Sequence, residues 1–206
     1  MEALARYENL AKYEGNGIVI TRQGVIPGNR RKRQEEILGR KRLWSAQFPE
    51  GTFLKLDSNK LPINDDPYTD SAASTDFSAF QMPQLIVKQS WQASIGRFQA
   101  AVVKSDERTS QGIICSESCV SIHTSEGNIR ILKAACLIYN SKIAVYYLFL
   151  SNGFFALYRP KVTVKDLLNV PIPSKEEVNL DSIKTSDGVD QFTNRLFALK
   201  DSEYTL

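Results

Sequence analysis

An α+β fold is predicted by three features of this sequence: one long apolar segment, several short alternating segments before it, and helical patterns near both ends. The apolar segment covers about residues 129–151 and contains neither glycine nor proline, so its length favours one buried helix over a strand. Segments 83–90, 98–103 and 112–124 alternate or are rich in β-branched residues, which is typical of strands. The predicted architecture is a mixed, mainly antiparallel sheet packed around the long helix.

The N-terminal segment predicts a short amphipathic helix over residues 1–14, because its apolar residues recur at helical spacing and Gly15-Asn16-Gly17 follows as a stop. A β-branched strand at 18–21 and a glycine- and proline-rich turn at 23–29 come next. These features divide the chain into an N-terminal helix (1–14), a main domain (15–173) and a polar C-terminal extension with a short helix (174–206).

Seven basic residues lie within positions 30–42, beside only two acidic ones, and form the strongest electrostatic feature of the sequence. Lys and Arg side chains neutralise DNA phosphates and release counterions. Phosphate contacts are therefore predicted for Arg30, Arg31, Lys32, Arg33, Arg40, Lys41 and Arg42. The alternative is a solvated run of charge, since the formal net charge of +3 does not by itself require nucleic acid.

Three cysteines and one histidine restrict the available chemistry. No secretory signal is recognised at the N-terminus, so reduced thiols and a cytoplasmic location are expected for Cys115, Cys119 and Cys136. A metal site is not expected, because Cys115 and Cys119 are spaced too widely for a zinc pair and only His123 could join them. His123 lies in an alternating strand, which favours an exposed strand residue over a catalytic base.

A membrane span competes with the buried helix, because about 20 apolar residues cross a bilayer. Lys133 and Lys142 lie on opposite faces of that helix, and each would cost roughly 2.5–3.5 kcal/mol near the bilayer centre. A buried helix and no membrane partner are therefore expected.

The long helix and the segment after it carry several short motifs. The helix contains Tyr139-Asn140-Ser141-Lys142 and Tyr146-Tyr147, and the later segment contains Val164-x-Asp166-Leu167 followed by Val170-Pro171-Ile172-Pro173. Together they resemble the TaqI-like C-terminal specificity domain of adenine-N6 DNA methyltransferases, which is related to the specificity subunits of type I restriction systems. The resemblance implies that the Asn-Ser-Lys helix packs under a recognition sheet.

The same resemblance implies a recognition loop after the strand at 83–90. In that family a strand of the pattern Pro-hydrophobic-hydrophobic-basic leads into such a loop. Gln and Arg side chains read adenine and guanine edges through paired hydrogen bonds, while Trp91 either stacks on a base or plugs the sheet. Base readout is therefore assigned to Lys88, Gln89, Trp91, Gln92 and Arg97.

Two other motifs match only in part. Gly24, Val25 and Gly28 match a family segment where the backbone turns toward DNA, although Pro27 stands where threonine is common. Asp65-Asp66-Pro67-Tyr68 differs at its second position from the Asp-Pro-Pro-Tyr motif with which amino-methyltransferases hold the target amine. No glycine-rich donor loop precedes it. The chain alone is therefore expected to carry no catalytic residues and no cofactor.

The predicted function is sequence-specific recognition of double-stranded DNA for a restriction-modification or phage-defence adenine-N6 methyltransferase. A partner methyltransferase domain or subunit would supply catalysis and hold S-adenosylmethionine. The alternative is a non-catalytic protein–protein interaction module, which the mild net charge favours. A nuclease is a third alternative, but the aspartates of the loop 57–80 lack the lysine and strand-end setting that metal-dependent nucleases need.

Overall fold

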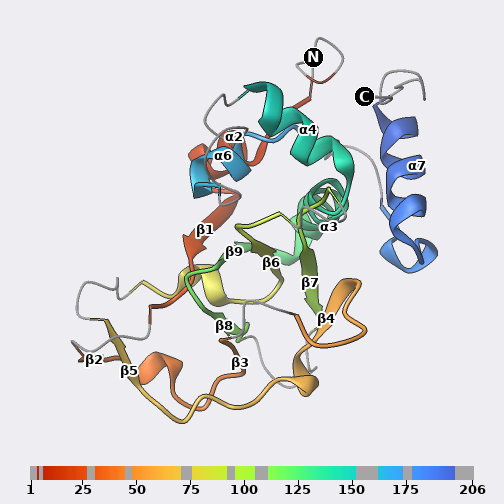
Figure 1. Cartoon of the computed structure of the whole chain (residues 1–206). Helices are drawn as coiled ribbons and strands as arrows, with labels where there is room; N and C mark the ends of the chain where they lie inside the picture. The colour runs from red at the N-terminus through yellow and green to blue at the C-terminus, as the bar shows by residue number, and fades with distance from the viewer. Residues whose placement is uncertain are drawn as a thin grey trace.

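The structure is a computed structural model and describes residues 4, 7–26, 31–44, 48–70, 76–91, 96–104, 111–151, 162–173 and 178–197. A five-stranded sheet lies between a layer of helices and an irregular layer of short strands and 3-10 turns (Figure 1). The strands are β1 (Val19–Gln23), β2 (Arg31–Arg33), β3 (Arg42–Leu43), β4 (Leu54–Asp57), β5 (Tyr68–Asp70), β6 (Gln84–Lys88), β7 (Ala100–Lys104), β8 (Ile114–Cys115) and β9 (Cys119–Thr124). The helices are α2 (Leu10–Gly15), α3 (Ile129–Tyr139), α4 (Lys142–Ser151), α6 (Val164–Leu168) and α7 (Ser186–Leu196). The 3-10 turns are η1 (Glu35–Ile37), η2 (Ser58–Lys60), η3 (Ser78–Phe80), η4 (Glu126–Asn128) and η5 (Leu180–Ser182).

The central sheet has the strand order β1-β9-β6-β7-β4. Its first four strands pair antiparallel, with Leu85 of β6 opposite both Ile122 of β9 and Val102 of β7. β4 pairs with β7 in parallel and places Leu54 opposite Ala101. The predicted α+β fold with a mixed, mainly antiparallel sheet is therefore confirmed.

The central strand β6 is buried along its whole length. Because successive side chains of a strand point to opposite faces, Leu85 and Val87 pack into the larger core with α3, and Ile86 packs into a second core on the other side. Phe77 and Phe80 belong to this second core. A strand covered on both faces gives a continuous apolar run, which explains the clear strand signal of this segment.

The apolar segment over about residues 129–151 forms two helices and not the single helix expected from its composition. α3 ends at Tyr139, α4 begins at Lys142, and the helical segments on either side of the break are bent by 78°. The side-chain amide of Asn140 pairs with both main-chain groups of Ala100 in β7, at 2.7 and 3.3 Å, as a neighbouring strand would. This contact fixes the end of α3 against the sheet.

α3 is the buried member of the pair, since all of its residues from 131 to 139 except Lys133 are buried. α4 buries only Ile143, Ala144 and Leu148. Within the described ranges, no single helix is long and apolar enough to cross a membrane; α3 with its leading turn and α4 meet that length and composition only as a bent pair.

The motifs that carry the family resemblance form contacts that hold helices and neighbouring segments together. The buried Tyr139 hydroxyl donates to Leu167 O of α6 at 2.8 Å. Thr163 and Asp166 form a capping box at the start of α6, which satisfies two otherwise free N–H groups. Ile172 N donates to Glu8 O at 2.8 Å and ties the Pro-x-Pro segment to the N-terminal region. These residues therefore stabilise the fold.

Candidate nucleic-acid interface

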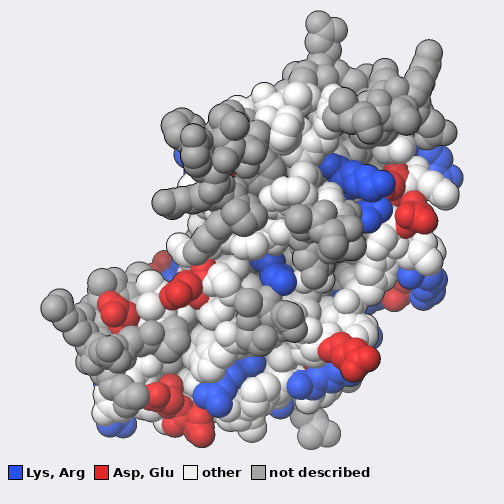
Figure 2. Space-filling view, in the orientation of Figure 1, with Lys and Arg blue, Asp and Glu red and all other residues white. Residues whose placement is uncertain are grey.

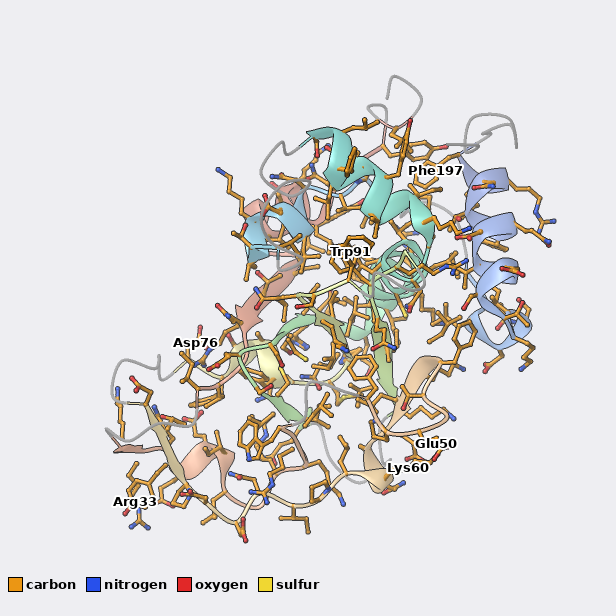
Figure 3. All side chains as sticks on the ribbon, viewed as in Figure 1. Arg33, Glu50, Lys60, Asp76, Trp91 and Phe197 are labelled. Atoms are coloured by element: carbon orange, nitrogen blue, oxygen red, sulfur yellow. The ribbon has the colours of Figure 1, made fainter. Side chains whose placement is uncertain are left out.

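The first group of predicted phosphate contacts lies on a two-stranded antiparallel ribbon formed by β2 and β5. Arg31, Lys32 and Arg33 of β2 stand opposite Asp70, Thr69 and Tyr68 of β5. The ribbon is separate from the central sheet and lies at one extremity of the molecule, where Figure 3 labels Arg33. Within β2, the Arg33 side chain is exposed and the Lys32 side chain is half-buried.

The charges on the ribbon are weakly engaged. Arg33 forms an ion pair through its Nε with Glu35, and both side chains are 61% exposed. Exposed pairs of this kind contribute about 0–1 kcal/mol, so a phosphate can replace the carboxylate at low cost. The Lys32 ammonium makes no hydrogen bond or ion pair with the described part of the chain. The backbone of Arg31 lies in β2, and Arg30 lies outside the described residues.

The second group, Arg40 to Arg42, follows the turn at Gly39 and behaves differently. Arg40 is only 4% exposed, and its guanidinium donates to two carbonyl oxygens, Gly112 O at 2.9 and 3.2 Å and Phe80 O. Burial lowers the pKa of Arg40 to about 10, and the nearby Glu36 carboxylate opposes this shift. Arg40 therefore stays charged at neutral pH although it is buried.

Lys41 and Arg42, the next two basic residues, are more exposed than Arg40. Lys41 Nζ donates to Leu61 O at 3.0 Å, which leaves two of its three N–H groups for another acceptor. Arg42 Nη1 contacts the Asn64 amide oxygen at 3.3 Å and the exposed Asp65 carboxylate at 3.1 Å. The basic run therefore divides into a ribbon group, in which Arg33 is exposed and Lys32 is half-buried, and a C-terminal group, in which Arg40 is buried.

Two of the residues assigned to base readout are engaged at the end of β6. Gln89 is 2% exposed, and its Oε1 accepts from Gln23 Nε2 at 3.1 Å. The Lys88 ammonium donates to Gln99 Oε1 at 2.9 Å. The assignment to base readout stays a prediction, and in this conformation these polar atoms are engaged within the chain.

Arg97 is the most firmly held member of the assigned set. Its Nη2 contacts Asp190 Oδ2 of α7 at 2.5 Å, and the other oxygen of Asp190 accepts from Lys142 N at the start of α4. Asp190 of α7 thus contacts both Arg97 and the beginning of α4. Trp91 is half-buried against the larger core, and Gln92 lies outside the described residues.

The two predicted sets of DNA-binding residues are not brought together. Figure 3 shows Arg33 at one extremity and Trp91 beside the helical layer in the opposite half of the molecule. In the face seen in Figure 2, Lys and Arg are interleaved with Asp and Glu, without a large area of one sign. Contacts to an anionic partner would therefore be local.

Lys104 was not among the residues predicted from the sequence, yet it closes β7 and lines one pocket together with Arg40 and Lys41. The signal in the sequence was a charged residue placed directly at the end of an alternating segment. The proximity of Lys104 to Arg40 could not be predicted, because 64 positions separate the two residues in the sequence.

The cysteines and the histidine lie in β8, β9 and α3. The described residues contain no group of three or more His, Cys, Asp or Glu side chains that could hold a metal ion. All three thiols are buried; desolvation raises the pKa of Cys136 to about 12 and that of Cys115 well above its usual value. His123 Nδ1 lies 3.0 Å from Pro83 O; the residue lies in a strand as predicted, but it is half-buried and not exposed.

Comparison with solved structures gives a weak structural likeness. No family model and no curated protein matches the chain. Among solved structures, it is similar to a chain from work on the complex assembly and conformational transition of the type I R-M system, with a TM-score of 0.38 and 14% sequence identity. The match covers 96% of this chain and 40% of that one, so this chain spans less than half of the matched length.

Proposed function

We propose that this chain is a DNA target-recognition module of a restriction-modification or phage-defence adenine-N6 methyltransferase. The observation that carries the proposal is the β2–β5 ribbon, whose strand β2 consists of three consecutive basic residues at one extremity of the molecule. The B-DNA major groove is about 12 Å wide and admits a two-stranded ribbon, whose strands lie about 4.8 Å apart. The ribbon therefore has suitable dimensions and charge for this groove.

The remainder of the fold supports the proposal by supplying a rigid body for the ribbon. α3 packs under the sheet, and the amide of Asn140, directly after α3, fixes the end of this helix to β7. A binding element supported by packed helices and strands is held more precisely than one on loops alone. In this proposal the partner is a methyltransferase domain or subunit, which holds S-adenosylmethionine and performs the chemistry.

A protein-interaction module remains the second candidate, favoured by one specific observation. Phe149 and Leu150 at the end of α4 are 51% and 48% exposed, although large apolar side chains are usually buried. A partner that covers α4 would not require the basic ribbon. Variants of the ribbon therefore separate the two candidates.

The ribbon variant Lys32→Gln/Arg33→Gln is expected to weaken binding to every DNA duplex, because it removes two phosphate contacts. The plot of log affinity against log salt should become shallower by about two units, one for each basic side chain that no longer neutralises a phosphate. Fluorescence anisotropy of a labelled duplex, measured over a salt series, gives both quantities.

The matched control is Arg130→Gln/Lys165→Gln, which removes one Arg and one Lys from exposed positions in the helical layer. This control should keep the wild-type slope. Equal weakening of DNA binding in the two double variants would contradict the ribbon assignment. A folded wild-type chain that binds no duplex at low salt would reject the function itself.

A further inference from the structure

A pocket of about 140 Å³ opens between η2, the C-terminal end of β7 and the residues that precede β3 and β8. A water molecule occupies about 30 Å³ in the liquid, so a group larger than one water fits. The lining includes Arg40, Lys41, Asn59, Lys104 and Gln111. Three of them are cationic, and none of these described lining residues is acidic.

Arg40 is the buried cation of this pocket. Its hydrogen bonds go only to carbonyl oxygens, which are neutral, and no described residue accepts from its Nη1. Burial of a charge is costly unless an opposite charge compensates it nearby. Glu36 offsets this cost only in part, since burial still lowers the pKa of Arg40 and no described carboxylate accepts a hydrogen bond from it. The pocket wall therefore favours an anion.

Lys41 and Lys104 add charge from two further segments. Lys41 keeps two N–H groups after its bond to Leu61 O, and the exposed Lys104 donates no hydrogen bond within the described part of the chain. The amides of Asn59 and Gln111 supply neutral donors beside them. Convergent Arg, Lys and amide donors suit a tetrahedral oxyanion with several acceptor oxygens.

We infer that this pocket binds a phosphate group, with Arg40 in its wall and Lys41 and Lys104 as accessible cations. The inference rests on the proposed function only for the source of the phosphate, which there is the DNA backbone. A free phosphate ion shares the same chemistry, so the experiment needs one arm for each source.

The test uses the whole chain and the variant Lys104→Gln, with Lys60→Gln as the matched control. Lys60 is an exposed lysine of η2 that does not line the pocket. In the first arm, calorimetric titration with inorganic phosphate at constant ionic strength should show binding at least tenfold weaker for Lys104→Gln than for Lys60→Gln. Thermal unfolding without phosphate checks that both variants are folded.

In the second arm, duplex DNA replaces phosphate. If the backbone is the source, Lys104→Gln should make the salt slope shallower by about one unit, whereas Lys60→Gln should not. A weakening confined to the first arm supports a pocket for free phosphate. The inference is overturned if Lys104→Gln and Lys60→Gln behave alike in both arms. The ribbon variants decide the proposed function independently of this result.

Discussion

Replacement of Gly24 by alanine is expected to destabilise the fold by about 3 kcal/mol or more, at the upper end of the range for overpacked sites. A Cβ built on Gly24 would lie 2.5 Å from the carbonyl carbon of Ser116 and closer still to the carbonyl oxygens of Ser116 and Cys115. All three atoms belong to the backbone, so no side chain can rotate away. Since whole domains are stable by only about 5–15 kcal/mol, this one change removes a large fraction of stability.

The backbone around Gly24 has little freedom to relax. Gly24 N donates to Cys119 O at 2.9 Å, and Val25 N donates to Cys115 O at 2.7 Å. A shift that relieved the clash would break these bonds, which hold the segment after β1 against β8 and β9. The glycine that sequence similarity associated with a turn toward DNA is thus required here for close approach between two main-chain segments.

The measurement is the midpoint of urea-induced unfolding, with Gly127→Ala as the control. Gly127 lies in η4, and a Cβ there meets no atom within 4 Å. Its replacement should change stability by about 0.5 kcal/mol or slightly stabilise the protein. A Gly24→Ala midpoint equal to that of Gly127→Ala would show that the two segments are not in close contact in solution.

Replacement of Asn140 by alanine is expected to cost about 2–4 kcal/mol, because it leaves buried main-chain groups without partners. The Asn140 amide satisfies both the N–H and the C=O of Ala100 and also donates to Cys136 O at 2.8 Å. Alanine cannot replace any of these bonds. The junction between α3 and β7 should therefore loosen, and amide hydrogen exchange at Ala100 should accelerate.

Ser141→Ala provides the matched control within the same turn. Ser141 Oγ donates to Ile138 O at 2.7 Å, but that oxygen also accepts from Ser141 N at 2.9 Å. Removal of the hydroxyl should therefore cost about 1 kcal/mol. If Asn140→Ala is no more destabilising than Ser141→Ala in urea unfolding, Asn140 does not hold the helix to the sheet.

The sequence by itself determined the fold class and the location of the strongest charge. Strand and helix patterns are set by the spacing of apolar residues over a few positions, so the buried strand at 83–88 and the apolar segment after 129 were predictable. The basic run was equally visible, and its first part lies on the β2–β5 ribbon. The break at Asn140 escaped prediction, because asparagine interrupts a helix only where its amide finds a better partner, and Ala100 is 40 positions away.

Only the tertiary structure decided which polar side chains remain available to a partner. Arg40 is bound to Gly112 O across 72 positions, and Arg97 is bound to Asp190 across 93. Neighbours in the basic run therefore have different roles: Arg33 is exposed, whereas Arg40 is buried. The physical reason is that the local spacing of apolar residues in the sequence indicates which of them are buried. A hydrogen bond or ion pair depends instead on a specific partner that the fold brings from a distant segment.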